Sequence, residues 1–429
     1  MKHRIVVLGA GYAGAVTAGR LARRLHRDDV EITLVNSDPD FVERIRLHQL
    51  ASGQDLPRRP LREVYEGTGV QVRRAWVTAV DADRKTVALS GENGAESLAH
   101  DTLASDTLAH DTLASDTLAY DTLAYDTLAY DTLVYALGST NADHGVPGVA
   151  EHAHHVAGKQ GALRLRARLA ELEPGETVLV VGGGLTGIEA ATEIAEAHPG
   201  LKVAIAAREG VGGWLSDKAQ RHLGLVFDRL GITVHQGADI ERVEADRVLT
   251  AAAGEIPAQV TVWTAGFTVH PVAAATTLRV SDTGRIIVDG TMRSVSHPDV
   301  YAVGDAALAD GAGGKALRMS CATATPMAWQ AADALAARLT GRKVPEKPIG
   351  YAAQCISLGR RDGILQRVTH EDQMTSTVIT GRAGARIKEF ICASTAWGLT
   401  HPTMLLPTRR HRLTPATSMA GTRRQAAET

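Results

Sequence analysis

The sequence predicts an α/β fold with two similar strand–turn–helix units, and three observations support this. The segment RIVVLGAGYAG at 4–14 joins a short apolar run to the glycine spacing G-x-G-x-x-G. The segment VLVVGGGLTGIEA at 178–190 repeats that arrangement. Each continues into an alanine-rich stretch, and a further apolar run follows at 31–35 and at 203–207. Such runs are typical of buried parallel strands, so two parallel sheets with covering helices are expected.

The first unit has the glycine pattern that lets a backbone approach a diphosphate. Gly9 permits the tight turn, Gly11 allows close approach of a pyrophosphate, and Gly14 lets the helix pack on the strand. The free N–H groups at the helix start also favour an anion. Asn36 stands at the end of the returning strand, where an acidic residue usually holds ribose hydroxyls. Because an amide both donates and accepts hydrogen bonds, we expect Asn36 to serve there.

The second unit carries the same pattern at Gly182, Gly184 and Gly187. Its returning strand ends without an acidic residue, and Arg208 follows. An arginine here either accommodates a 2′-phosphate, which favours NADP(H), or is simply solvated, and the sequence leaves both open. Glu189 lies one turn into the helix, where its simplest role is to interact with the helix dipole.

Residues 98–132 repeat a five-residue unit seven times, as LAHDT, LASDT and LAYDT. A period of five matches neither a helix nor a strand, so the leucines cannot hold one face of either. Pentapeptide solenoids space their small and apolar positions differently. We therefore expect a tandem expansion that forms a loop on the surface, which low-complexity composition also favours.

Composition excludes several other classes of function. The formal net charge is −2, which gives no support for nucleic-acid binding. The three cysteines lie far apart in the sequence without any C-x-x-C pair, so no metal site is expected and a cytoplasmic location is favoured. No apolar run approaches the roughly 20 residues that cross a bilayer. The length of 429 residues leaves room for two or three domains.

The C-terminal half contains further strands and one more candidate ligand. The strand expected at 300–303 is followed by Asp305, at the carboxyl end where open α/β sheets bind ligands. A helix is expected at 327–339, after an irregular segment. Strand-like runs at 355–358 and 377–380 predict a smaller third domain. The arginine-rich tail that begins at 407 is expected to be disordered.

These motifs together resemble the pyridine nucleotide-disulfide oxidoreductase superfamily of flavoproteins. GAGYAG at 9–14 is similar to its FAD motif, GGGLTGIE at 182–189 to its NAD(P)H motif, and YAVGDAA at 301–307 to its second FAD motif. The phrases FVERIRLHQLASG at 41–53 and YDTLVYALGS at 130–139 resemble the type II NADH dehydrogenase and apoptosis-inducing-factor branch.

The resemblance implies an FAD-binding domain at 1–149 and 272–342, split by an NAD(P)H-binding domain at 150–271. A C-terminal α+β domain at 343–406 and the tail at 407–429 would follow. FAD would be held by the first glycine turn and Asn36, with Asp305 on its ribityl chain. NAD(P)H would be held by the second turn and Arg208, with Glu189 near the nicotinamide as the one candidate catalytic side chain. In the segment 41–53, the residues Arg44, Arg46 and His48 either touch the cofactor or are merely solvated.

The implied reaction is hydride transfer from NAD(P)H to FAD, followed by electron transfer to a quinone or another small acceptor. Quinone-reducing members carry paired glutamines after the Gly-Asp motif, whereas this chain has only Gln330 in that region, next to Trp329. Two alternatives therefore stay open: a reductase of a carrier protein such as a ferredoxin, and an NAD(P)H-sensing flavoprotein without significant turnover.

The last apolar residues before the tail raise the question of a membrane surface. Trp397, Leu399 and the run 404–406 precede several arginines, a combination that suits an anionic surface. The same residues would equally serve as core or as a homodimer interface, and Pro402 and Pro407 interrupt the segment. We expect the core or interface role and keep peripheral attachment as the alternative.

Overall fold

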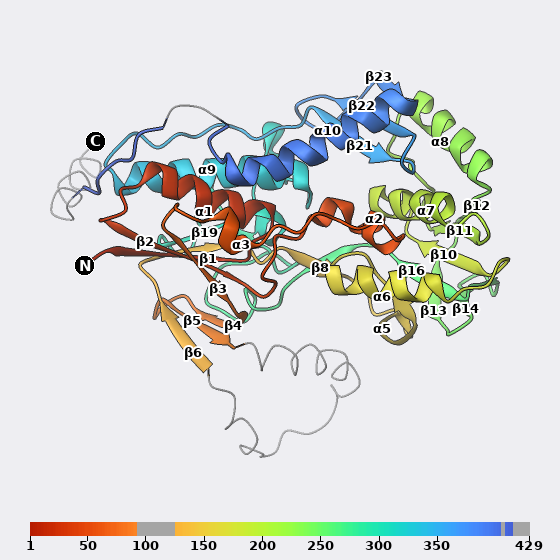
Figure 1. The fold of residues 1–429 in the computed structure, drawn as a ribbon, viewed down its shortest axis with the longest axis horizontal. Helices are drawn as coiled ribbons and strands as arrows, with labels where there is room; N and C mark the ends of the chain where they lie inside the picture. The colour runs from red at the N-terminus through yellow and green to blue at the C-terminus, as the bar shows by residue number, and fades with distance from the viewer. Residues whose placement is uncertain (92–124, 405–407, 415–429) are drawn as a thin grey trace, which may run out of the picture.

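The computed structural model describes residues 1–91, 125–404 and 408–414. The chain forms two parallel sheets, each covered by helices, and a small antiparallel sheet followed by a long helix (Figure 1). The predicted α/β fold with two Rossmann-like units is confirmed. Within the described ranges, no helix combines the length and the hydropathy needed to cross a bilayer.

The first sheet has the strand order β19-β7-β1-β2-β3, and neighbouring strands pair in parallel. Because β19 comes from the C-terminal half of the chain, this unit is assembled from two separate segments. Two helices, α1 and α9, lie side by side on it (Figure 1). In spatial order the strands are Val300–Ala302, Thr132–Tyr135, His3–Leu8, Val30–Asn36 and Val70–Arg74, and the helices are Tyr12–Arg24 and Cys321–Leu339.

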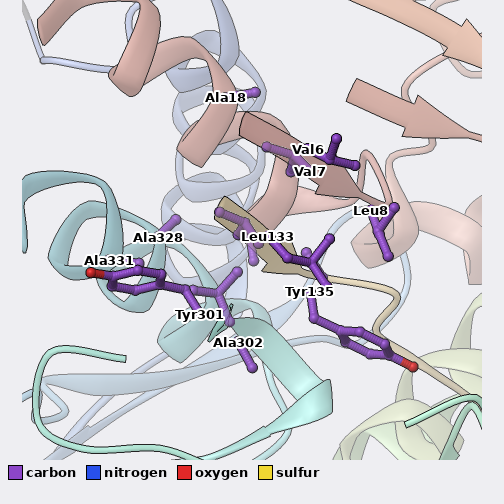
Figure 2. Packing of buried hydrophobic residues seen from close by; sticks show 14 of the residues in the cluster. Val6, Val7, Leu8, Ala18, Leu133, Tyr135, Tyr301, Ala302, Ala328 and Ala331 are labelled. Carbon is purple, nitrogen blue, oxygen red and sulfur yellow. The ribbon is translucent and has the colours of Figure 1, made fainter. Parts of the chain in front are cut away.

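The core of this unit lies between the sheet and the two helices. Val6, Leu133 and Ala302 from three neighbouring strands are fully buried. Figure 2 shows them together with Tyr301, whose ring lies close to Ala328 of α9. Small alanines on α9 let the helix approach the strands closely.

The helix α9 begins six residues earlier than the sequence predicted. It starts at Cys321 and contains Pro326, where an irregular segment was expected. Pro326 is the sixth residue of this helix, so it removes one i→i−4 hydrogen bond, and packing of α9 on α1 stabilises the helix in spite of that loss. The segment 41–53 is likewise less regular than its apolar pattern suggested. It forms a short 3-10 turn, η1 (Arg44–Arg46), and then α2 (Leu47–Ala51).

An antiparallel meander β4-β5-β6 follows the first sheet, and it contains the end of the pentapeptide repeat. Its strands are Trp76–Asp81, Thr86–Ser90 and Tyr125–Ala129. The predicted loop is therefore wrong for 125–132. There Tyr130 is fully buried, Asp131 forms an ion pair with Arg4 at 3.0 Å, and Thr132 opens β7. The earlier copies at 98–124 lie outside the described residues.

The second parallel sheet has the order β12-β11-β10-β16-β9. Helices α6 and α7 flank it, α8 packs beside α7, and a separate antiparallel sheet, β13-β14-β15, packs against it as an extension. The strands of the parallel sheet are Thr233–Gln236, Lys202–Ala207, Thr177–Val181, Val260–Trp263 and Ala153–His154; the extension is Ile240–Val243, Arg247–Thr250 and Glu255–Pro257; the helices are Lys159–Ala170, Leu185–Ala197 and Asp217–Leu230.

The C-terminal part is an antiparallel sheet β21-β22-β23 and the 20-residue helix α10. The sequence analysis predicted strands here but did not anticipate the helix. The tail was expected to be disordered, yet residues 408–414 lie against the first unit, where Arg412 pairs with Asp29 at 2.8 Å. The elements are Ala353–Ser357, Gly363–Val368, Met374–Thr380 and Gly381–Thr400. Shorter elements complete the described fold: α3 (Leu61–Val64), β8 (Ser139–Asn141), α5 (Val149–His152), β17 (Phe267–Val269), β18 (Ile286–Ile287), η3 (Gly304–Ala306), β20 (Ala307–Leu308) and η4 (Ala312–Gly314).

Candidate active site

One cavity of about 1190 Å³ connects all three parts of the molecule. Its wall includes Gly11 at the start of α1, Gly184 at the start of α7, and Asp305 after β19. The far end is closed by Cys355 of β21 and Lys388 of α10. A cavity at the carboxyl ends of two parallel sheets is where open α/β folds bind their ligands.

The two glycine turns have nearly the same geometry. A Cβ atom added at Gly11 or Gly184 would meet no atom within 4 Å, so the backbone there is open to a ligand. A Cβ atom added at Gly14 or Gly187 would lie 1.9 Å from a carbonyl oxygen at the start of the same turn, so these two positions admit only glycine. Each turn thus leaves the first N–H groups of its helix free for a diphosphate, and the residues fit two dinucleotides.

Asn36 is used differently from the ribose contact that the sequence suggested. Its Oδ1 accepts a hydrogen bond from the N–H of Ala10 at 2.8 Å, and its Nδ2 donates to the carbonyl of Asp38 at 2.8 Å. The side chain therefore holds the glycine turn against the returning strand. Its contact with a bound ribose stays a prediction.

Asp305 lies in a polar cluster with two residues from other elements. Its Oδ2 accepts a hydrogen bond from the Ser139 hydroxyl at 2.6 Å and lies 3.5 Å from Nη1 of Arg44. The guanidinium of Arg44 also lies over the ring of Phe267, 5.1 Å from its centre. Burial lowers the pKa of Arg44, an effect that the carboxylate of Asp305 opposes. The cluster offers a carboxylate, a hydroxyl and a cation to a polyhydroxyl chain.

Arg208 lies at the rim of the cavity, directly after β11. Its side chain is 71% exposed, and it forms a long ion pair with Asp239, with 3.9 Å between Nη1 and Oδ1. A guanidinium held this loosely can turn towards a phosphate without losing a buried interaction.

Glu189 is the centre of a buried network at the far end of the cavity. It is only 4% exposed, and its Oε1 lies 2.8 Å from Nζ of Lys388 and accepts the N–H of Ser357 at 2.9 Å. Nδ1 of His48 lies 3.8 Å from Oε2. Burial lowers the pKa of His48 to about 4, so its imidazole is neutral near pH 7. Burial alone would lower the pKa of Lys388, but Glu189 reverses this and raises it. The network therefore holds an ammonium group at neutral pH.

The three cysteines, distant in sequence, line the same cavity. Cys321 opens α9, Cys355 lies on β21 and Cys392 on α10. Burial raises the pKa of each thiol, to about 11 for Cys355 and Cys392, so they are protonated at neutral pH. In the described part of the chain, no group of three or more His, Cys, Asp or Glu residues is placed to hold a metal ion.

Gln330 does not belong to this wall. Its Nε2 donates to the carbonyls of Pro345 at 2.8 Å and Gly290 at 3.3 Å, which fixes it inside the first unit. The glutamine that would mark a quinone reducer is thus committed to backbone contacts, and the start of α9 presents Ser320 and Cys321 to the cavity.

The sequence analysis missed Lys388, the group that pairs with Glu189. The buried positions of α10 are Gly384, Lys388, Cys392, Ala396 and Leu399, a spacing of one helical face. A lysine in the middle of such a row of small and apolar residues is a detectable signal, because buried lysines require a partner.

Comparisons with known proteins agree with this geometry. The chain is 29% identical over 349 residues to an NADH dehydrogenase-like protein of Mycobacterium tuberculosis, covering 76% of this chain and 78% of the relative. It is 24% identical over 381 residues to the demethylphylloquinone reductase NdbB of Synechocystis, covering 85% and 86%. The structure of NDH2 from Plasmodium falciparum in complex with NADH superposes with a TM-score of 0.74 at 14% identity, covering 94% of this chain and 97% of that one.

Residues 3–336 match the family described as pyridine nucleotide-disulphide oxidoreductase. This match spans both glycine turns and Asp305, the positions on which the two predicted dinucleotide sites depend. The chain therefore belongs to the pyridine nucleotide-disulphide oxidoreductase family, as a flavin oxidoreductase whose cofactors are FAD and NAD(P)H.

Proposed function

We propose that this enzyme oxidises NAD(P)H and passes the electrons to a quinone or another small acceptor. The observation that carries the proposal is the single cavity lined by both glycine turns and by the Glu189–Lys388 pair. Two dinucleotides and an acceptor would then bind next to one another in the same cavity. The names of the Mycobacterium, Synechocystis and Plasmodium relatives support an NADH dehydrogenase-like reaction.

The residues divide the binding work between the two turns. Gly9, Gly11 and Gly14 would hold the diphosphate of FAD, with Asp305 accepting from its ribityl hydroxyls. Gly182, Gly184 and Gly187 would hold the diphosphate of NAD(P)H. FAD, when bound, accepts a hydride from NAD(P)H and passes electrons onward, so no side-chain acid or base is required for the first half.

The acceptor half does need protons, because a quinone becomes a quinol only when both of its oxygens are protonated. The ammonium group of Lys388 is charged and faces the cavity, and Glu189 holds its orientation. We assign Lys388 as the group that donates a hydrogen bond and then a proton to an acceptor oxygen. His48, whose pKa burial lowers to about 4, is neutral beside the pair.

The outer face of α10 suits attachment to a membrane surface. Phe390 is 72% exposed, and Trp397, seven residues further along the helix, is 38% exposed. The same helix also carries Arg382 and Arg386. Exposed aromatic rings beside basic residues favour an anionic bilayer. Because α10 also supplies Lys388, attachment by this helix would place the acceptor end of the cavity close to a lipid-soluble substrate.

Three measurements test the proposal. Purified protein should show flavin absorbance, and anaerobic NADH or NADPH should bleach it. Steady-state turnover is then measured against a panel of quinones, dyes and ferredoxin. Turnover with ferredoxin alone would select the carrier-protein reductase, and bleaching without turnover on any acceptor would select the NAD(P)H-sensing flavoprotein. A folded protein that takes up no FAD would refute the reading as a whole.

A further inference from the structure

Glu193 is a buried carboxyl group that the reaction described above does not use. It lies on α7 one turn beyond Glu189, and the residue is only 1% exposed. Its Oε1 accepts a hydrogen bond from Nε2 of Gln54. Its Oε2 is buried and has no hydrogen-bond partner among the described residues. An unpaired buried carboxyl oxygen is costly, so its presence on a buried helix face calls for a role.

Three carboxylates follow one face of α7 from the cavity to the surface. Glu189, Glu193 and Glu196 are four and then three residues apart, which places them in successive turns on the same side. Glu189 lines the cavity, whereas Glu196 is partly exposed and accepts the N–H of Arg360 at 2.6 Å. Glu193 thus occupies the position between the acceptor site and solvent.

Burial brings the pKa of Glu193 into the neutral range. Burial raises its pKa to about 7, against the opposing effects of Arg360 and of the hydrogen bond from Gln54. Glu196 and Glu189 raise it further. A carboxyl group in this range can take up and release a proton at physiological pH, which an ordinary surface glutamate cannot.

We propose that Glu193 relays protons from the surface at Glu196 to the Glu189–Lys388 pair in the cavity. The inference rests on the proposed acceptor reduction. In that reaction NAD(P)H, one proton and a quinone give NAD(P)⁺ and a quinol. The donor supplies one hydrogen nucleus with two electrons, so one proton per turnover must come from solvent. Lys388 gives its proton to the acceptor oxygen, and the relay returns one to Lys388. Glu193 is a positioning residue in this scheme, because it acts through Lys388.

The test compares Glu193→Gln with Glu171→Gln, which removes an exposed carboxylate at the end of α6. Infrared spectra of the holoenzyme, recorded between pH 5 and pH 9 without substrate, should show a protonated-carboxyl band that disappears near pH 7. Glu193→Gln should abolish this band and Glu171→Gln should keep it. A band that survives in Glu193→Gln would overturn the assignment whatever the acceptor is.

The second readout separates the two half-reactions by stopped flow. The rate of bleaching by NAD(P)H should be unchanged in Glu193→Gln. The rate of reoxidation by the quinone should fall about tenfold or more, and it should no longer decrease above pH 7 as it does in the wild type. An unaltered pH profile of reoxidation would exclude the relay. If Glu193→Gln does not fold, Glu193→Asp keeps the carboxyl group, and the proposal then requires the pH at which the band disappears to shift. Failure of the wild-type protein to turn over with any quinone would instead refute the proposed function and leave the infrared result standing.

Discussion

At the scale of single residues, Arg208 is the candidate contact for the adenosine ribose of the nicotinamide dinucleotide, because it lies at the rim of the cavity. It follows β11 at the position where an acidic residue would bind a 2′-hydroxyl, and it is free to turn. We predict that Arg208 binds the 2′-phosphate of NADPH, which NADH lacks. Arg208→Ala should lower kcat/KM for NADPH by about tenfold to a hundredfold, the value of one charge-assisted hydrogen bond.

Parallel measurements with NADH decide whether this effect is specific. The value of kcat/KM for NADH should stay within about twofold in Arg208→Ala, because NADH has no 2′-phosphate to lose. Arg221→Ala, an exposed arginine on α8, is the control for loss of positive charge. Equal losses of kcat/KM with both donors would mean that Arg208 does not bind the 2′-phosphate of NADPH.

Titration of Glu193 should also make the free energy of unfolding depend on pH. Its pKa of about 7 in the folded chain lies above the ordinary value of 4.5, so the folded state binds the proton more tightly than the unfolded state. This contribution to the free energy of unfolding is fully present below about pH 4.5 and is lost as the pH rises through 7. Relative to wild type, Glu193→Gln should therefore gain stability between pH 5 and pH 8, by at most about 3 kcal/mol.

Urea denaturation of both proteins across this pH range measures the difference. The free energies should converge at the acid end, where both side chains are neutral. A difference that stays constant with pH would show that Glu193 does not titrate in the folded protein.

At the scale of elements, the sequence predicts best what is encoded locally. The two glycine turns are encoded by the glycine spacing within 4–14 and 178–190, where Gly14 and Gly187 pack on a carbonyl oxygen of their own turn, and both turns appear where expected. The start of α9 and the whole of α10 were missed, because their stability comes from packing on distant elements. Pro326 argued against a helix before residue 327. The mixed polarity of α10 gave no clear helical pattern, because this helix buries only one narrow face.

The exposed aromatics of α10 lead to a prediction about lipid binding. The holoenzyme should sediment with anionic liposomes at low salt, and the double variant Phe390→Ser with Trp397→Ser should bind at least about tenfold more weakly. Each ring loses about 1.5–3 kcal/mol of favourable burial when it cannot enter the interface. Leu225→Ser on α8, which removes a 67% exposed leucine, is the matched control.

The opposite outcome has a definite meaning. If the full-length chain stays in the supernatant, α10 does not bind membranes. Light scattering would then show whether a second copy covers Phe390 and Trp397, since a homodimer contact is the other use for exposed rings on one helix face.

At the scale of the whole molecule, the cavity is a product of topology that no local pattern reveals. Its wall takes residues from the first sheet, the second sheet and the C-terminal part, which lie more than 300 positions apart in the sequence between Gly11 and Lys388. Sequence patterns could nominate Gly184, Glu189 and Asp305, because each belongs to a motif. They could not show that three scattered cysteines share one wall, since that depends on how β21 and α10 dock.

Deletions within the pentapeptide repeat can show how much of this segment the fold requires. The last copies supply β6 and the start of β7, so we expect that the repeat cannot be removed as a whole. Deleting 98–122 leaves 91–97 and 123–124 to connect β5 to β6, whose antiparallel pairing begins at Ser90 and Tyr125. Because closure entropy changes by only about 0.6 kcal/mol per doubling of loop length, this deletion should raise the Tm by a few degrees at most and leave flavin content unchanged.

Extending the deletion should have the opposite effect. Removing 98–132 takes away β6, the buried Tyr130 and the ion pair between Asp131 and Arg4. It also removes Thr132, which pairs with Ile5 at the centre of the first sheet. Loss of a central strand residue and a fully buried tyrosine should cost several kcal/mol, enough to unfold the first unit. Circular dichroism and bound flavin measured on both deletions distinguish the cases, and a stable, yellow protein lacking 98–132 would show that the last copies are replaceable too.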